Sequence, residues 1–319
     1  MEPVLDTLQQ AIEYFSNPVT CREYVVARRW PNGVECPRCG SKNVAFLDKY
    51  DRWQCSARHD GRQFAKTGTV FEDSPLPLSK WLMAMWEVVN CKNGVSSYGV
   101  HRAIGITQKS AWFMDHRIRH ALTLGTINKL SGQIEAGETL IGGKARNMRR
   151  AKRERVITGT GGKDEAAVMG ILERGSKVTG SKVRAKVVEN TKKKALQSEI
   201  REHVLAGSAI FTDALQSNDG LDEFQHEVAG HAVEYVRGEV HTNGLENFWS
   251  LLKRSIWGTY VSVEPFHLFR YLDEQAWRYN QRKMNDGERF DLAVRAAIGK
   301  RLSWNQLTGK VAKNPPSVN

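Results

Sequence analysis

The order of apolar and polar residues changes along the chain and separates a strand-rich region from a helical one. Apolar spacing predicts a helix over residues 5–15, and short alternating strands with turn residues between them follow as far as residue 72. Residues 81–90 are apolar on most faces and predict a core helix, which Leu78 and Ser79 cap. The helical region therefore begins near residue 76.

Residues 96–122 predict two further helices joined by a short turn at Gly105. Thr107 can cap the second helix, which gains positive charge from basic residues at positions 109, 117 and 119. This pattern fits a helix-turn-helix whose second helix enters the major groove of DNA. An ordinary helical hairpin fits the pattern equally well, and the sequence leaves both interpretations open.

The third region, over residues 130–280, alternates strands with helices. Strands are predicted over 134–143, 165–175, 181–190 and 208–215, and helices over 192–207, 241–260 and 264–298. Three strands, a helix, a strand with an acidic tip and a later acidic helix describe an α/β domain of the RNase H type.

Composition limits the class of protein. At 319 residues, 40% of them hydrophobic, the chain can form two or three domains with sizeable cores. No apolar run reaches the roughly 18 residues that a membrane span requires. The N-terminal residues also lack the basic-then-apolar order of a secretory signal. We expect a soluble protein, cytoplasmic and nucleoid-associated in a bacterium or nuclear in a eukaryote.

A formal net charge of +12 indicates a polyanionic partner. Residues 144–155 are dense in Lys and Arg, and residues 192–194 are consecutive lysines. The solvated surface of a helix or loop would explain either run alone. Two such runs beside other nucleic-acid signals favour contact with DNA phosphates.

The cysteines predict a metal site. There are five, an odd number, which argues against a disulfide framework. Cys36 and Cys39 form a C-x2-C knuckle, and Cys55 and His59 supply a second pair after 15 intervening residues. Two such pairs on adjacent hairpins can surround Zn²⁺ with a tetrahedron of ligands, and the metal would supply folding energy to this small segment. Free cysteines with an unrelated surface histidine are the alternative.

Two carboxylates in the third region are candidates for phosphoryl-transfer chemistry. Asp213 is predicted at the C-terminal end of a strand, where α/β sheets present functional groups. Glu246 lies 33 positions later, early in a helix, and Lys253 follows two turns further on the same face. Converging carboxylates can hold two Mg²⁺ ions about 4 Å apart, and a lysine there can hold a phosphate.

Each of these residues also has a structural explanation. Asp213 could cap a turn, and Lys253 could be an exposed surface base. Glu246 could complete a capping box opened by Asn243, because N-x-x-E is a common helix start.

Several longer stretches carry a resemblance that covers nearly the whole chain. They are RWPNGVECPRCGS, WQCSARH, QFAKTGTVF, ETLIGGK, FTD, HTNGLENFWSLLKRSIWGTY and FRYLDEQAWRYNQR. The chain resembles the DDE-class insertion-sequence transposases with an N-terminal zinc ribbon, a group related to the eukaryotic Merlin elements. The resemblance implies an RNase H-like domain whose D-D-E triad and two Mg²⁺ ions, or Mn²⁺, cleave DNA at the transposon end. The freed 3′-OH then attacks target DNA.

The resemblance also assigns roles to individual residues. It makes Asp213 the second acid, Glu246 the third acid and Lys253 their associated base. His241 and Asn243 belong to the motif HTNxxE and are expected near the metals. The family has an aspartate as the first acid of its D-E-T stretch, and this chain has Gly137 there.

No neighbour is expected to replace the missing carboxylate. Glu138 points to the other face of the strand because side chains alternate. Glu135 is on the same face but lies about 6.6 Å back along the strand. We therefore predict that strand cleavage and joining are very weak or absent while DNA binding persists. A non-catalytic DNA-binding protein or regulator is the alternative function.

The predicted fold class is α+β and multidomain, with DNA as the partner and no membrane association. The domains are an N-terminal helix and zinc ribbon (1–75), a helical DNA-binding domain (76–128), an RNase H-like domain (129–300) and a tail (301–319) whose end, KNPPSVN, is disordered. By resemblance, synapsis of two transposon ends requires a homo-oligomer of at least two subunits. The predicted DNA contacts are Lys109, Arg117, Arg119, Lys144, Arg146, Arg149, Arg150, Lys152, Arg153, Lys192, Lys193, Lys194 and Arg254.

Overall fold

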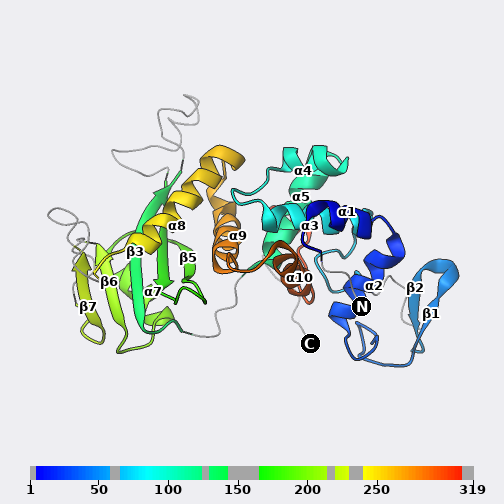
Figure 1. The fold of residues 1–319 in the computed structure, drawn as a ribbon, viewed down its shortest axis with the longest axis horizontal. Coiled ribbons are helices and arrows are strands. Elements are labelled where there is room, and N and C mark those ends of the chain that lie inside the picture. Colours follow the sequence, from blue (N-terminus) through cyan, green and yellow to red (C-terminus); the bar gives the residue numbers. More distant parts are fainter. Residues whose placement is uncertain are drawn as a thin grey trace. The chain divides into compact units, whose positions relative to one another are not determined.

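The protein divides into two compact units (Figure 1). The computed structural model describes residues 5–57, 65–123, 129–142, 165–213, 220–229 and 240–310. Residues 1–122 and 284–319 belong to the helical unit, and residues 123–283 belong to the sheet unit. None of the helices in the described ranges is both long and apolar enough to cross a membrane.

The sheet unit contains a mixed five-stranded sheet. Its strands are β3 (Gln133–Ile141), β4 (Ala166–Glu173), β5 (Lys182–Val188), β6 (Ala209–Asp213) and β7 (Gln225–Ala229). They lie in the order β5-β4-β3-β6-β7, with β4 antiparallel to both β3 and β5, and with β3, β6 and β7 parallel. This order and these directions are those of the RNase H fold, so the predicted α/β domain is confirmed.

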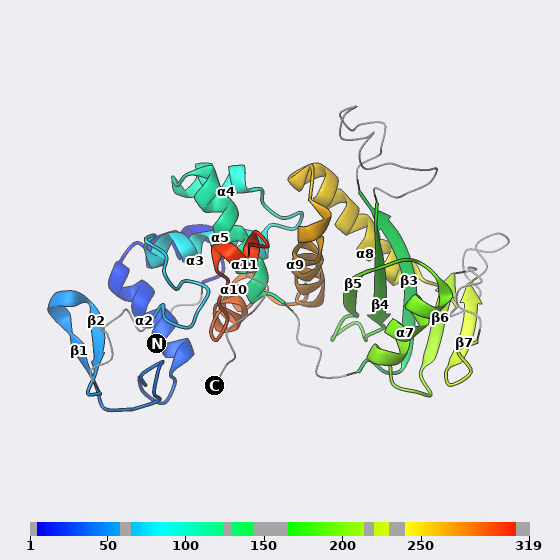
Figure 2. The ribbon, with the colours of Figure 1, turned by 180° about the vertical axis from the view of Figure 1, so that it is seen from behind.

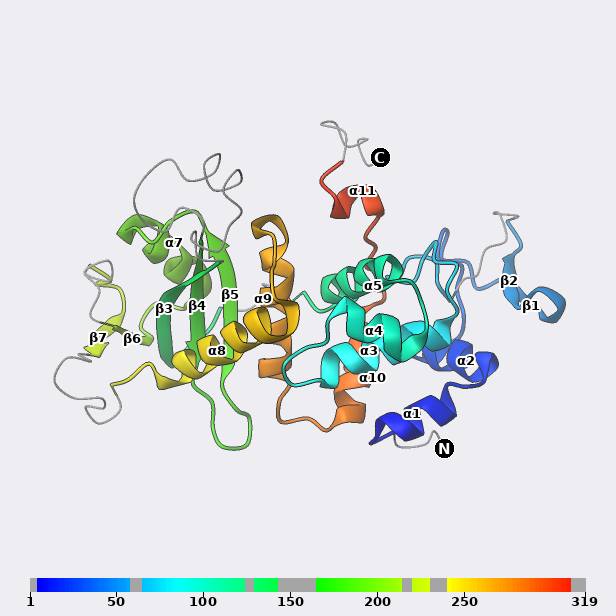
Figure 3. The ribbon, with the colours of Figure 1, turned by 90° about the horizontal axis from the view of Figure 1, so that it is seen from above.

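Helices cover both faces of this sheet because successive strand residues point to opposite sides (Figure 3). On one face, α7 (Lys193–His203) packs Leu196 and Ile200 into a core with Ile134 of β3. On the other, α8 (Asn243–Arg254) packs Leu245 and Phe248 into a core that also contains residues of β4, β5 and α9 (Leu268–Asn280). Thus β3 lies in the middle of the sheet between two apolar layers.

The helical unit is built around α3 (Leu78–Asn90), the predicted core helix (Figure 2). Its neighbours are α1 (Leu8–Tyr14), α2 (Pro18–Arg29), α4 (Ser97–Ile104), α5 (Gln108–Ala121) and α10 (Asp286–Ala296). Burial of Trp81, Leu82, Met85 and Trp86 in α3 confirms its predicted role. The predicted cap is wrong, because the N-cap is Pro77 and no side chain caps this helix.

A zinc-ribbon hairpin and a short C-terminal helix complete the helical unit. The hairpin pairs β1 (Val44–Leu47) with β2 (Arg52–Cys55), joined by the single turn η1 (Asp48–Tyr50). The last described helix, α11 (Trp304–Leu307), lies within the predicted tail, and KNPPSVN lies outside the described residues.

The C-terminal helix α10 belongs to the helical unit, although it falls within residues 129–300 that the sequence assigns to one domain. Phe290 is fully buried, and its ring centroid lies 5.6 Å from that of Phe15 and 5.1 Å from that of Trp86. These aromatic contacts hold α10 against helices from the start of the chain. The four domain boundaries themselves stay a prediction.

Asp291 provides a polar connection between α10 and α2. Its carboxylate accepts hydrogen bonds from the Tyr24 hydroxyl at 3.1 Å and from Arg28 Nε at 2.6 Å, and also from Arg295 Nε at 2.7 Å. Burial alone would raise the pKa of this carboxyl, but the hydrogen bonds from Arg295 and Arg28 outweigh burial and lower it.

Replacing Asp291 with Asn should lower the free energy of unfolding by about 1–3 kcal/mol at neutral pH, since it removes charge-assisted hydrogen bonds. Because the folded-state pKa is depressed, this stabilisation is present above the unfolded-state pKa of about 4 and is lost as pH falls through the folded-state pKa. Urea unfolding at neutral pH and at about pH 3 should show the difference between wild type and variant shrinking in acid. A difference that stays constant with pH contradicts this assignment.

Candidate active site and metal centre

Three thiols gather where the ribbon hairpin meets the preceding turn. Cys36 and Cys39 lie in that turn, and Cys55 ends β2. The three sulfur atoms all lie within 4.8 Å of one another, and those of Cys39 and Cys55 are 3.6 Å apart. The turn is tight because the Gly40 N–H donates to the Cys36 carbonyl at 2.8 Å, and the Cys36 N–H donates to Ser41 at 2.9 Å.

This sulfur cluster fits a structural zinc ion. Zn²⁺ takes thiolate ligands in a tetrahedron, and the cluster offers three corners of one. Burial alone would raise the pKa of the Cys36 thiol. Hydrogen bonds from the backbone N–H groups of Arg38 and Cys39 outweigh burial and lower this pKa, which favours a thiolate. His59, the predicted fourth ligand, lies outside the described residues.

Cys21 has a different environment. It is fully buried in α2, where its thiol donates to the Phe15 carbonyl at 3.2 Å. Burial raises the pKa of Cys21 to about 11, so this thiol stays protonated and packs as an apolar group in the core.

The two neighbouring strands β3 and β6 bring two predicted acid positions together. They run parallel, with Glu135 paired to Phe211. The pairing ends there: Gly137 is two residues further along β3, and Asp213, whose side chain lies outside the described part of the structure, is two residues further along β6 as its last residue. A side chain at 137 would therefore start next to the end of β6.

The first turn of α8 lies over the same position. A Cβ atom built on Gly137 would stand 3.3 Å from a Leu245 methyl group, and Glu246 is the next residue of the helix. Glu246 is exposed, and its carboxylate accepts a hydrogen bond from the Thr242 hydroxyl at 3.2 Å. Gly137 of β3 thus adjoins the first turn of α8, although more than a hundred residues separate them in the chain.

Glu135 fixes the start of α8 to the sheet. Its carboxylate is 1% exposed, and Oε2 accepts the backbone N–H of Leu245 at 2.8 Å. Oε1 accepts Arg174 Nε at 2.7 Å. A Cβ on Gly244 would stand only 3.0 Å from Oε2, so glycine permits this close approach. A carboxylate at a helix N-terminus is also favoured by the helix dipole.

Glu135, Arg174, Gly244 and His241 together form what we term the helix clamp. Arg174 Nη2 lies 2.9 Å from His241 Nδ1 and also donates to the His241 carbonyl. His241 Nδ1 lies 3.5 Å from the Glu135 carboxylate. Sequence reasoning did not assign Arg174 a role, because it lies 39 residues from its partner and belongs to no recognisable motif.

The helix clamp also bears on two sequence-level alternatives. Movement of Glu135 toward position 137 would break its hydrogen bonds to Arg174 and Leu245, an obstacle additional to the distance along the strand. The capping box opened by Asn243 is wrong: Asn243 is the first residue of the helix, its N-cap is Thr242, and no side chain caps it. Glu138 follows the expected alternation, since Ile134 and Ala136 on its side of β3 belong to the core beneath α7.

The predicted DNA contacts fall into three groups. Lys109, Lys192, Lys193, Lys194 and Arg254 are exposed and Lys253 is half-buried, so contact with a phosphate stays a prediction for them. Residues 144–153, with Lys144, Arg146, Arg149, Arg150, Lys152 and Arg153, lie outside the described residues. The third group requires a correction.

Arg117 and Arg119 do not reach a groove-facing surface. They are 4% and 2% exposed, and the Arg117 guanidinium donates to the Glu72 carbonyl. Burial lowers the pKa of Arg117 to about 10. The helical pair itself forms as predicted: Gly105 adopts a left-handed conformation with φ 61°, and the Thr107 hydroxyl caps α5. Its entry into a DNA groove stays a prediction.

We expect the full-length chain to hold a single Zn²⁺ and Cys36→Ser to lose most of it, because a structural zinc needs all its thiolates. Zinc content after exhaustive dialysis, measured by atomic emission, tests this. Cys21→Ser is the matched control, because Cys21 lies in the core away from the cluster and its loss should leave zinc content unchanged. Equal zinc in the two variants contradicts the assignment.

Two glycines paired across β3 and β4 should respond differently to substitution. A Cβ on Gly170 would stand 2.5 Å from the Trp249 ring, whereas a Cβ on Gly137 would stand 3.3 Å from a Leu245 methyl group, its nearest neighbour among the described residues. Gly170→Ala should therefore lower the free energy of unfolding by roughly 1–3 kcal/mol through overpacking. Gly137→Ala should stay within about 1 kcal/mol of wild type, since alanine loses less backbone entropy and Leu245 can shift. Chemical unfolding compares them, and an equal loss contradicts the geometry.

Comparison with known proteins gives the family. Residues 129–280 match the ISXO2-like transposase domain, and residues 17–59 match the transposase zinc-ribbon domain. The chain is 30% identical over 240 residues to an uncharacterised protein in transposable element ISH50 of Halobacterium salinarum, an alignment covering 71% of this chain and 79% of that protein. No solved structure matches. With its sulfur cluster, its RNase H-type sheet and these matches, the chain belongs to the ISXO2-like transposase family.

Proposed function

We propose that this chain is a DNA transposase that binds the terminal inverted repeats of an insertion element and has impaired chemistry. The parent activity would be phosphodiester cleavage at the element's ends and transfer of the freed strand to target DNA. The observation that carries this proposal is that the first turn of α8, which contains Glu246, packs over Gly137 of the central strand β3, while β6, which ends at Asp213, runs parallel beside β3.

The donor set for catalytic metals is incomplete. Asp213 and Glu246 would hold Mg²⁺ or Mn²⁺, since hard oxygen ligands suit both ions. When bound, such ions activate the attacking oxygen and stabilise the leaving one in phosphoryl transfer. Gly137 offers no ligand atom, and the carboxylate of Glu135 belongs to the helix clamp. This chain therefore supplies two of the three carboxylate ligands that the family's metal site uses.

The remaining residues have roles that do not depend on the metal. The helix clamp orients the start of α8 and thereby the Glu246 backbone. Lys253, half-buried in the last turn of α8, would hold a phosphate of the DNA strand. His241 and Asn243 would lie near the reacting phosphate, as the family motif implies. The exposed lysines 192–194 at the start of α7 would hold flanking DNA.

The size of the expected defect follows from the role of the missing ligand. Losing a residue that only supports a metal ligand commonly reduces metal affinity or activity about 10–100-fold. A carboxylate that binds both ions directly should matter more, so turnover by this chain should fall by at least that factor.

A non-catalytic DNA-binding protein is the second candidate function. Gly137 favours it, because a protein retained only for binding has no need of the first acid. Binding would then rest on the zinc ribbon and the helical pair, and a homo-oligomer of at least two subunits would still bring two DNA ends together.

Restoring the carboxylate separates the two candidates. In a plasmid nicking assay with the element's own ends and Mg²⁺ or Mn²⁺, Gly137→Asp should increase cleavage by about 100-fold or more over wild type. Gly137→Ala, which fills the same space without a ligand, should not. The double variant Gly137→Asp with Glu246→Gln should lose this increase in cleavage.

Two results decide against this proposal. Robust cleavage by wild type shows that the first acid is dispensable here. A folded Gly137→Asp protein that binds the element's ends without cutting them favours the binding protein.

A further inference from the structure

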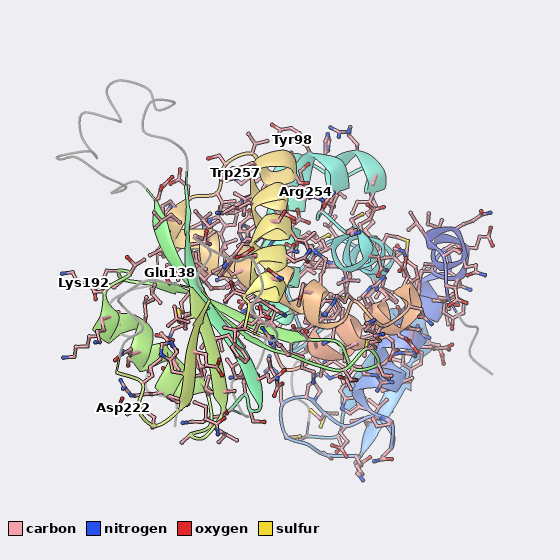
Figure 4. The ribbon with its side chains drawn as sticks, turned by 60° about the vertical axis from the view of Figure 1, so that its left-hand side comes forward. Tyr98, Glu138, Lys192, Asp222, Arg254 and Trp257 are labelled. Atoms are coloured by element: carbon pink, nitrogen blue, oxygen red, sulfur yellow. The ribbon has the colours of Figure 1, made fainter. Side chains whose placement is uncertain are left out.

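A large aromatic side chain projects into solvent just beyond α8. This helix continues into the π-helical turn η4 (Ser255–Tyr260), where Trp257 is 55% exposed. Figure 4 shows Trp257 and Arg254 near the same end of α8. Exposed tryptophan is unusual, because its indole is among the largest apolar surfaces a protein can bury. A ligand that covers the ring would explain its position.

The backbone that carries Trp257 is anchored on both sides. Before it, Ser255 and Ile256 are buried, and the Ser255 hydroxyl donates to Gln275 of α9 at 3.2 Å. After it, the Tyr260 ring packs edge-on against Tyr271 with centroids 4.7 Å apart, and its hydroxyl donates to Glu274. The indole is therefore presented by a fixed support, and a ligand that covers it pays little ordering entropy.

Trp257 also shares a helix face with the candidate active site. The buried residues of α8 are Leu245, Phe248, Trp249 and Leu252. On the solvent side, Glu246, Arg254 and Trp257 follow one another, with Lys253 beside Arg254. Eleven residues at about 1.5 Å each place Trp257 roughly 16 Å beyond Glu246 along the helix. That span corresponds to a few nucleotides of an extended DNA strand.

We propose that Trp257 is a stacking platform for an unpaired DNA base, with Arg254 and Lys253 contacting the adjoining phosphates. An aromatic plane next to two cations complements a base next to its phosphates. A second copy of this chain is a poorer occupant, because a two-fold interface would bring the same cations of both copies together. The proposal rests on the proposed function only in requiring DNA as the ligand.

Two DNA probes of equal duplex length test this. One is a blunt 20-base-pair duplex, and the other carries four unpaired thymidines at one 3′ end. Base–aromatic stacking corresponds to roughly a 5- to 150-fold change in affinity per base. In fluorescence anisotropy with the full chain, Trp257→Ala should lose affinity for the overhang probe by such a factor and bind the blunt probe within about twofold of wild type.

Further variants make the result specific. Trp257→Phe should retain most of the overhang affinity, because it keeps an aromatic face. Arg254→Gln should lower the affinity for both probes and reduce the slope of log affinity against log salt by about one. Val178→Ala is the matched control: Val178 is 84% exposed in the turn between β4 and β5 of the same unit and should change neither probe.

The outcomes separate the stacking site from DNA binding itself. If wild type binds neither probe, both this proposal and the proposed function fail. If wild type binds both and Trp257→Ala changes neither, or changes both equally, the stacking site is overturned and DNA binding stands. If Trp257→Ala dissociates an oligomer in sedimentation without DNA, the ring is covered by a second copy and the proposal is also overturned.

Discussion

A carboxylate buried inside the sheet unit determines where α8 can lie. An isolated buried charge costs several kcal/mol, so Glu135 is tolerated only while its donors stay in place. Two of those donors, the Arg174 guanidinium and the Leu245 N–H, come from the end of β4 and the first turn of α8. Any sliding of α8 across the sheet would break these bonds. The position of Glu246 over the sheet therefore follows from an interaction made by its neighbour.

The glycines near the helix clamp have different physical explanations. Gly244 and Gly170 are required by close approach, to the Glu135 carboxylate and to the Trp249 ring respectively. Among the residues that the structure describes, no such contact requires Gly137, because a Cβ there would meet only a methyl group at the end of the flexible Leu245 side chain. Packing thus accounts for two of the three glycines and does not account for Gly137.

Local patterns predicted much of the fold. Apolar alternation was sufficient for β3, β4, β5 and β6, and continuous apolar residues were sufficient for α3. The sequence reading missed β7, because its QHEVA sequence gives almost no apolar alternation at the edge of the sheet. It also missed α2, although Asn17 caps that helix and Pro18 begins it, which is a recognisable start signal.

The candidate site was less predictable, because its key contacts join distant parts of the chain. Spacing and the family resemblance predicted positions 137, 213 and 246 as site residues but not Arg174, whose contacts form only when β4 and α8 are packed together. Arg117 and Arg119 were assigned to DNA because positive charge was equated with exposure. The packing of α5 overrides that rule, burying residues around nearly all of its circumference.

The chain passes from the helical unit to the sheet unit and back again, which affects the order in which the two units can finish folding during synthesis. The helical unit contains residues 1–122 and also residues 284–319, so the sheet unit is inserted into it. Phe290 completes an aromatic cluster whose other members, Phe15, Tyr24 and Trp86, leave the ribosome some two hundred residues earlier. Until α10 emerges from the ribosome, those rings lack the Phe290 side chain that packs against them. By then all strands and helices of the sheet unit have already been synthesised. A nascent chain would therefore complete the sheet unit before the unit that carries the ribbon and the helical pair.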